Sequence, residues 1–144
     1  MTSNMDLLHR AIDRWNAGDL NGYLELYDPS IRLHGYTPEP MDKAAVTGFY
    51  NQIWDSLAEA GRPNPKLEVL DALEADSKIA CRFRMSGIHS GEFMHVPASS
   101  ARYALPGITI LRFENGRVVE RWSSADMLGL LIQIGAIPAP AAAA

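Results

Sequence analysis

One carboxylate stands where an alternating segment of the sequence meets an apolar one. Asp126 follows the segment 117–125 and directly precedes the apolar run 127–132. Trp122, four residues earlier, shares the strand parity of Asp126, so both side chains would lie on one face. If that face lines an apolar cavity, burial without a neighbouring cation raises the pKa of the carboxyl group towards the working pH. We therefore expect Asp126 to serve as a general acid and base.

Asp126 also suits a structural role. Aspartate is a leading N-cap residue, because its side chain accepts a hydrogen bond from a free backbone N–H in the first helical turn. An apolar helix over 126–134 would place Asp126 at its start. Both interpretations stay open at this point, because one residue can cap a helix and still exchange protons with a substrate.

His34 is the second candidate for catalysis. In the alternating segment 30–36 it lies on the face opposite Ile31 and Leu33. A histidine there could hold a substrate oxygen or share a proton with Asp126. It could equally be a half-exposed strand residue without a catalytic role.

Six further side chains are candidates for the wall of a substrate pocket. They are Arg112, His89, Trp122, Glu120, Trp54 and Tyr50. By strand parity Arg112 faces away from Asp126, so a shared site would need a bulge between Trp122 and Asp126. Glu120 would more readily form an ion pair with Arg82 or Arg84. Trp54 and Tyr50 follow a helical period that suits a core position, and His89 could also be structural.

A hairpin is predicted to position Asp126. An Asn-Gly pair at 115–116 separates two alternating segments, and both residues of a type I′ turn need a positive φ, which Asn and Gly tolerate. In a regular register Phe113 pairs with Val118, and Thr109 pairs with Trp122. The hairpin then ends at the start of the apolar C-terminal helix.

The order of the remaining elements predicts an α+β fold. Helical periods cover 3–17, 19–27, 43–60 and 126–134, and alternating segments cover 30–36, 66–75 and 78–89 before the hairpin. Because helices come first and strands later, the layout is not the alternating one of a parallel sheet. A sheet bent at Gly87 and Gly107 around the N-terminal helices would enclose a cavity. We expect one domain over 1–137 and a mobile Pro/Ala tail over 138–144.

Composition excludes several classes of function. The chain has 144 residues, a net charge of −4 and no basic cluster, which argues against nucleic-acid binding. It has no apolar run of the roughly 18 residues that span a membrane, and its first residues lack the pattern of a signal peptide. The single Cys81 and the four scattered histidines do not predict a metal centre. These features predict a cytoplasmic protein.

Several segments resemble one known family. GIHSGEF at 87–93, ITILRFENGRVVERWSSAD at 108–126 and LGLLIQIG at 128–135 are similar to motifs of the SnoaL-like polyketide cyclases, and the N-terminal segment 15–35 is similar as well. This family has the nuclear transport factor 2-like fold, a cone-shaped curved sheet wrapped over three N-terminal helices with a short C-terminal helix. One departure is the loop 97–101, Pro-Ala-Ser-Ser-Ala, where the family commonly has Pro-Pro-Thr-Gly.

The resemblance implies an enzyme that needs no cofactor and no metal. Cyclases of this family close a ring by intramolecular aldol condensation of a polyketide ester, and their general acid and base is an aspartate at the position of Asp126. The implied partners are a small apolar or polyketide-like ligand and a second copy of the chain, bound through the outer sheet face with Ile108, Ile110 and Val119. A non-catalytic binder of a small molecule with the same fold is the alternative. Hydrolysis would need a second carboxylate, which the sequence does not place.

Overall fold

The computed structural model of the protein describes residues 2–141, and the elements in this range follow the predicted order. They are α1 (Asn4–Asn16), α2 (Leu20–Leu24), β1 (Tyr27–His34), α3 (Lys43–Leu57), β2 (Lys66–Ala75), β3 (Lys78–Ile88), β4 (Arg102–Glu114), β5 (Arg117–Ala125) and α4 (Met127–Gln133). Residues 138–141 are exposed and belong to no helix or strand, and the rest of the predicted tail, 142–144, lies outside the described residues.

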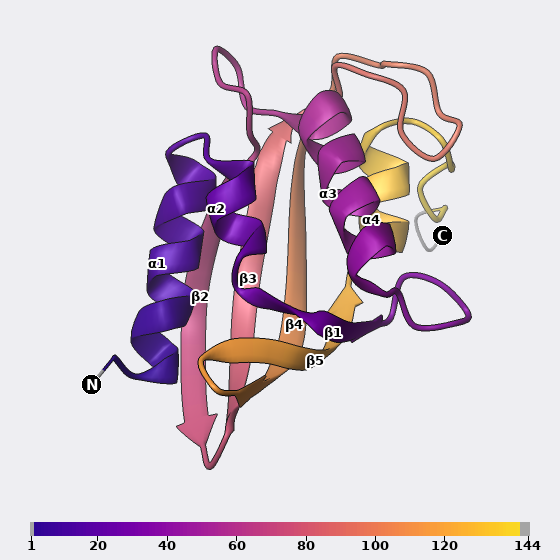
Figure 1. The fold of residues 1–144 in the computed structure, drawn as a ribbon. Helices are drawn as coiled ribbons and strands as arrows, with labels where there is room; N and C mark the ends of the chain where they lie inside the picture. Colours follow the sequence, from indigo (N-terminus) through magenta and orange to yellow (C-terminus); the bar gives the residue numbers. More distant parts are fainter. Residues whose placement is uncertain (1, 142–144) are drawn as a thin grey trace.

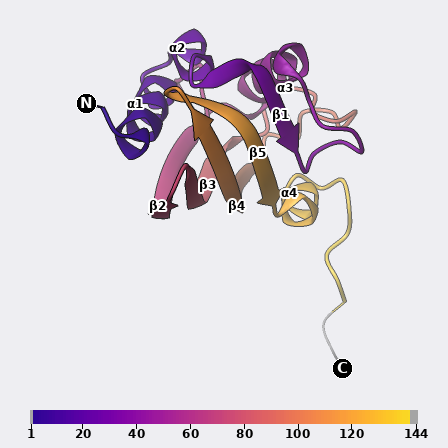
Figure 2. The ribbon, with the colours of Figure 1, turned by 60° about the horizontal axis from the view of Figure 1, so that its bottom comes forward.

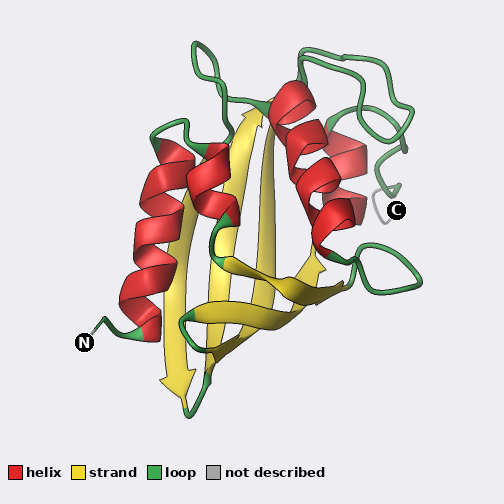
Figure 3. Cartoon of the chain, in the orientation of Figure 1, coloured by secondary structure: helices red, strands yellow, loops and turns green. Residues whose placement is uncertain are grey.

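The strands form one mixed sheet in the order β1-β5-β4-β3-β2, in which only the β1–β5 pair is parallel. Helices α1, α2 and α3 cover one face of this sheet, and α4 lies at the end of β5 (Figures 1 and 2). Figure 3 shows the same separation into a helical layer and a sheet layer. The α+β prediction is therefore confirmed.

The sheet is not strongly curled, so the expected cone shape is corrected. The prediction placed bends at Gly87 and Gly107. In the structure both glycines lie in an uninterrupted β3–β4 ladder, in which Gly87 pairs with Tyr103 and Gly107 with Phe83. Gly107 instead makes room for a side chain, because a Cβ there would lie 2.4 Å from the ring of Phe83.

Local side chains satisfy free backbone groups at the ends of the helices. Ser3 and Asp6 form a reciprocal capping box at the start of α1, and the apolar stripe of this helix is buried. α2 is shorter than predicted. Asp28 and Pro29, just after the predicted helical segment 19–27, lie inside β1, an edge strand, where proline is tolerated. Because β1 begins at Tyr27, the side chain of Tyr27 belongs to the sheet and is buried.

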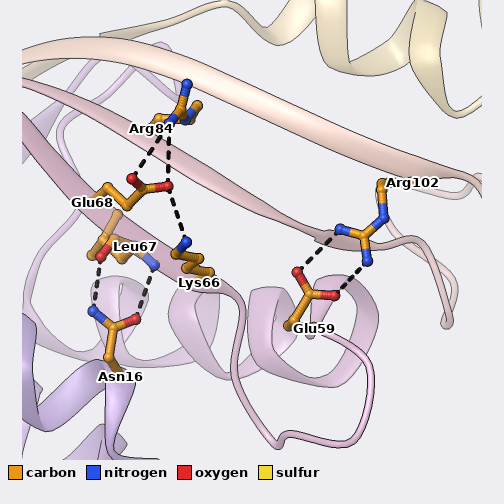
Figure 4. A network of polar contacts seen from close by, with 7 residues as sticks. All are labelled: Asn16, Glu59, Lys66, Leu67, Glu68, Arg84 and Arg102. Atoms are coloured by element: carbon orange, nitrogen blue, oxygen red, sulfur yellow. Dashed lines mark hydrogen bonds and ion pairs between the residues drawn. The ribbon is translucent and has the colours of Figure 1, made fainter.

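Polar contacts fasten the helical layer to the exposed edge of the sheet. The amide of Asn16, the last residue of α1, donates to the Leu67 carbonyl at 2.8 Å and accepts from the Leu67 N–H at 3.0 Å (Figure 4). It thereby pairs with the free edge of β2 as a neighbouring strand would. Glu59, just after α3, forms a two-bond ion pair with Arg102 at the start of β4.

A bulge near the turn decides which residues of β5 face the helices. Phe113 pairs with Val118, as predicted, but the next pair is Arg112 with Glu120, so Val119 is an extra residue on β5. A bulge reverses the face of every later side chain. Thr109 therefore pairs with Ser123, and the prediction that it pairs with Trp122 is wrong.

Candidate functional site

A cavity lies between the helices and the inner face of the sheet. The centres of water molecules can occupy a volume of about 60 Å³ inside it, which is enough for several waters. Most of its wall is aliphatic or aromatic and comes from α1, α3, α4 and the inner faces of the strands. Its polar side chains are Tyr23, Tyr27, Tyr36, Tyr50, Cys81, Thr109 and Arg121. Among the residues that the structure describes, no aspartate, glutamate, lysine or histidine lines it.

Arg121 is the one charged side chain on this wall within residues 2–141, and only 6% of it is exposed. The bulge at Val119 turns it inward, opposite Leu111 of β4. Its Nε donates to Thr109 Oγ1 at 2.7 Å, and its Nη1 donates to Tyr27 Oη at 2.7 Å and to Tyr50 Oη. These bonds come from three different elements, so the guanidinium is held in one orientation.

The guanidinium has no anionic partner in the part of the chain that the structure describes. No carboxylate lies within 4.0 Å of it, and Nη2 donates no hydrogen bond to a described residue. A buried charge without a counter-ion is costly and therefore rare. An arrangement of this kind is typical of a site that receives its counter-charge from a ligand.

The phenol groups around Arg121 form a hydrogen-bonded cluster. Tyr23 Oη and Tyr27 Oη lie 2.6 Å apart, and Tyr36 Oη lies 2.9 Å from Ser123 Oγ on the inner face of β5. Tyr50 Oη accepts a hydrogen bond from Arg121, and the hydroxyls of Tyr23 and Tyr27 are its further hydrogen-bonding neighbours. Arg121 Nη2 and this hydroxyl cluster therefore lie side by side on the cavity wall.

Burial and charge set the protonation of these groups. Burial acts to lower the pKa of Arg121, but the phenol oxygens of Tyr27 and Tyr50 outweigh it, and the pKa lies well above its ordinary value. Burial raises the pKa of Tyr23 and Tyr50, although Arg121 acts in the opposite sense. At neutral pH the site therefore consists of a guanidinium cation among neutral phenols.

We expect most of the tyrosines to resist ionisation until the protein unfolds. Four of the five, Tyr23, Tyr36, Tyr50 and Tyr103, have a pKa raised chiefly by burial. Because their unfolded pKa is about 10, the unfolded state loses these protons first, and stability falls as the pH rises above about 10. Phenolate absorbance measured against pH should therefore appear together with loss of circular dichroism. Reversible ionisation of all five in the folded protein would contradict this.

The whole chain has relatives with a common architecture. A model of the SnoaL-like polyketide cyclase family matches residues 5–134. The chain belongs to this family. Aklanonic acid methyl ester cyclase DnrD of Streptomyces peucetius is 22% identical over 140 residues, which cover 94% of this chain and 92% of DnrD.

Two solved structures superpose over most of the chain. AclR of Streptomyces galilaeus, described as a candidate hydroxylase, matches with a TM-score of 0.82 and 26% identity, covering 94% of this chain and 97% of AclR. IdmH of Streptomyces antibioticus, described as a candidate polyketide cyclase, matches with a TM-score of 0.74 and 26% identity over 92% of this chain and 99% of IdmH. The fold is thus nuclear transport factor 2-like, as the resemblance implied.

The structure does not place Asp126 on the cavity wall. Asp126 is exposed, and its Oδ1 accepts a hydrogen bond from the Gly129 N–H at 2.9 Å, which caps α4. Its neighbour Met127 lines the cavity instead. The expected orientation, with Trp122 and Asp126 on one inner face, is corrected, because the bulge at Val119 turns Trp122 to the outer face, where 37% of it is exposed.

The outer face of the sheet collects most of the other predicted site residues. His34 Nε2 lies 2.8 Å from Glu120, whose other oxygen accepts from Arg112 at 3.2 Å, and the ring of His34 stacks on Trp122. The expectation that Glu120 pairs with an arginine of β3 is wrong. The four residues are thus brought together, but across the sheet from the cavity, because β1, β4 and β5 present them on their outer sides.

Of the remaining pocket candidates, one lines the cavity and two do not. Tyr50 of α3 lines the cavity and contacts Arg121. Trp54, one turn later, packs edge-on against Trp15 at 5.2 Å in the core and is not part of the wall. His89 is fully buried away from the cavity, where its Nδ1 accepts from the Ser99 N–H at 3.1 Å.

Arg121 and Tyr27 were not among the predicted site residues. The regular hairpin register placed Arg121 on the outside, and the predicted second helix assigned Tyr27 to the wrong element. One signal was available. Regular alternation buries the carboxylate of Glu120, which needs a basic partner on the same face, but the alternating segment 78–89 places Arg82 and Arg84 on the face opposite its apolar residues. In residues 2–141 no group of three potential metal-ligating side chains gathers, and no helix is long and apolar enough to cross a membrane.

Proposed function

We propose that the protein is a cyclase or isomerase that acts on a small polyketide-like carbonyl compound bound in the cavity, with Arg121 and Tyr50 holding the reacting oxygen. The observation that carries the proposal is a buried, oriented guanidinium without a counter-ion in an otherwise apolar cavity. Family membership supports the class of chemistry, since DnrD is a methyl ester cyclase.

The geometry suits stabilisation of an oxyanion during aldol ring closure. The nucleophilic carbon of the substrate attacks a carbonyl carbon of the same molecule, a C–C bond forms, and the carbonyl oxygen becomes an alkoxide. Arg121 Nη2 and the Tyr50 hydroxyl can both donate to that oxygen. Tyr50 then gives it a proton and recovers one from water, while Arg121 stabilises the transient phenolate.

Ring closure can be tested with a linear poly-β-carbonyl methyl ester of the kind that an aldol step converts into a ring. The purified protein is incubated with this compound, and the products are separated by chromatography and identified by mass spectrometry. We expect a cyclic aldol product, or its dehydrated form, at a rate well above that without protein. The variant Arg10→Met, which changes an exposed arginine of α1, should behave as the wild type. Recovery of unchanged substrate across a series of chain lengths would defeat the proposal.

One observation favours non-catalytic binding as the second candidate. No carboxylate or imidazole lines the cavity among the described residues, so no strong base is positioned there. A protein that only binds would retain the compound unchanged, and native mass spectrometry followed by product analysis separates the two functions.

Asp126→Asn separates the two interpretations of this carboxylate. Asparagine can keep the cap on α4, so we expect unfolding free energy and ring-closure rate to stay close to the wild-type values. Asp126→Ala should lose about 1 kcal/mol of stability, because the Gly129 N–H loses its acceptor. If Asp126→Asn abolished turnover at unchanged stability, Asp126 would be the general acid and base, acting through Oδ2 while Oδ1 keeps the cap.

We further propose that the outer sheet face forms a homodimer. Ile108, Ile110 and Trp122 are 58%, 39% and 37% exposed on that face. A monomer would leave this apolar surface in contact with water, whereas a dimer interface would bury it. Light scattering should give twice the chain mass of 15.8 kDa. Ile108→Glu should yield monomers, whereas Leu128→Glu, at an equally exposed position (58%) on α4, should not. A monomeric wild type would contradict the proposal.

A further inference from the structure

The cavity is small for a site that binds an organic compound. It has room for several waters, which at about 30 Å³ each fill roughly the volume of one six-membered carbon ring. Pockets for larger organic ligands typically enclose about 300–1,000 Å³. A side chain that limits the volume of the cavity therefore also limits which compounds the cavity accepts.

Phe93 is a wall residue that no helix or strand contributes. It comes from the segment 89–101, which joins β3 to β4 beside the end of α3 (Figure 1), and only 1% of it is exposed. Most of the other wall residues belong to helices or strands and also hold the two layers together. The ring of Phe93 fills volume at the cavity without being part of this framework.

The backbone is strained where it holds Phe93 at the cavity. Phe93 and Val96 exchange two backbone hydrogen bonds, of 3.0 and 2.8 Å, around a two-residue turn. The turn residues Met94 and His95 both have a positive φ, of 49° and 65°. Glycine and asparagine adopt this conformation readily, whereas it is unfavourable for methionine. Strain of this kind concentrates at positions that serve function, which directs attention to the residue that the turn positions.

Contacts with α3 fix the segment in front of this turn. Ser56 Oγ donates to the Glu92 carbonyl at 2.6 Å, and the Gly91 N–H donates to the Ser56 carbonyl at 3.2 Å. A Cβ at Gly91 would lie 2.8 Å from the backbone oxygen of Asp55, so the segment lies directly against the helix. Phe93 is therefore a fixed part of the wall.

We propose that Phe93 determines ligand size and restricts the cavity to carbonyl compounds of about one six-membered ring, bound with their oxygen on Arg121. This inference rests on the proposed function in taking the cavity as the substrate site. It adds the size class of the substrate, a short chain that closes a single ring. Truncation of Phe93 should open the cavity to compounds with a second, fused ring.

Two ketones that differ only by a fused ring can measure this limit. Cyclohexanone has one ring, and 1-decalone carries a second ring next to the same carbonyl group. Binding of each ketone is followed by nuclear magnetic resonance titration of the wild type, Phe93→Ala and Phe93→Leu. Phe113→Leu is the matched control, because Phe113 is also buried, with 2% exposed, but does not line the cavity.

We expect the wild type to bind cyclohexanone at least about 10-fold more tightly than 1-decalone. In a pocket with enough room the order should be the reverse, because 1-decalone buries more apolar surface. Phe93→Ala should therefore prefer 1-decalone, and Phe93→Leu should give an intermediate ratio of the two affinities. Phe113→Leu should keep the wild-type ratio, although it loses stability as any truncation in the core does.

Three results would overturn the inference. They are a wild type that binds 1-decalone as tightly as cyclohexanone, an affinity ratio that truncation of Phe93 leaves unchanged, and no binding of cyclohexanone to the wild type at high millimolar concentration. If Phe93→Ala does not fold, the ratio for Phe93→Leu decides.

The ring-closure assay separates this failure from failure of the proposed function. A wild type that shows the size preference but closes no ring refutes only the cyclase. A wild type that closes single and fused rings equally well refutes only the size limit set by Phe93.

Discussion

Arg121→Met is expected to lower kcat/KM for ring closure by about 10²- to 10³-fold, the usual effect of removing one donor to a developing oxyanion. Methionine has a similar length and apolar character, so it can occupy the same space against Phe83 and Leu111. The loss should appear mainly in kcat if the guanidinium binds the transition state more strongly than the substrate.

The same substitution should not weaken the fold. Arg121 leaves no counter-ion behind when it is replaced, and exchanging buried ionic groups for apolar side chains that fill the space is often neutral or stabilising. The hydroxyls of Thr109, Tyr27 and Tyr50 lose a donor, but water in the cavity can bond to them. Chemical unfolding of Arg121→Met should therefore give a free energy equal to or above that of the wild type.

This combination distinguishes a functional arginine from a structural one. Natural proteins often keep a destabilising group where activity needs it, so lost turnover with retained or raised stability indicates a role in the site. Arg121→Lys keeps the charge but not the planar fork, so its kcat/KM should lie between those of the wild type and Arg121→Met. A drop of several kcal/mol in unfolding free energy for Arg121→Met would instead make Arg121 a residue that holds the hydroxyl cluster in place.

Local signals in the sequence predict the elements of this fold well. Ser3, Asp42 and Asp126 are of residue types that favour N-caps, and they accept capping bonds at the starts of α1, α3 and α4. Asn115 and Gly116 both have a positive φ, as the predicted hairpin turn requires. These features depend on a few adjacent residues, so tertiary packing does not have to be known to predict them.

The site could not be predicted in the same way, because it depends on where a strand is interrupted. Side-chain alternation has a period of two, and the single extra residue Val119 exchanges Glu120 and Trp122 for Arg121 and Ser123 on the inner face. A second register shift, between Val69 and Asp71 of β2, likewise leaves Leu73 72% exposed. Regular alternation would place Leu73 on the same face as Leu67. No residue type in either segment requires a bulge, so the sequence pattern alone favours the regular strand.

The second large effect is expected at the end of β1, where Gly35→Ala should cost about 4 kcal/mol of stability or prevent folding. Gly35 has a φ of +119° and lies just beyond His34, which pairs with Trp122 of β5. A Cβ at Gly35 would lie 1.9 Å from the backbone oxygen of Ser123. Backbone cannot swing aside as a side chain can, so the parallel β1–β5 pair would have to separate, in addition to the strain of the positive φ.

The damage should reach the cavity as well as the fold, because the same stretch of backbone carries Tyr36, whose hydroxyl lies 2.9 Å from Ser123 Oγ. Gly48→Ala is the matched control. Gly48 lies within α3, a Cβ there meets nothing within 4 Å, and removing a helical glycine should add up to about 1 kcal/mol of stability. Thermal unfolding of both variants should shift in opposite directions. A Gly35→Ala protein as stable as the wild type would mean that β1 and β5 are not held as closely at this point as the structure shows.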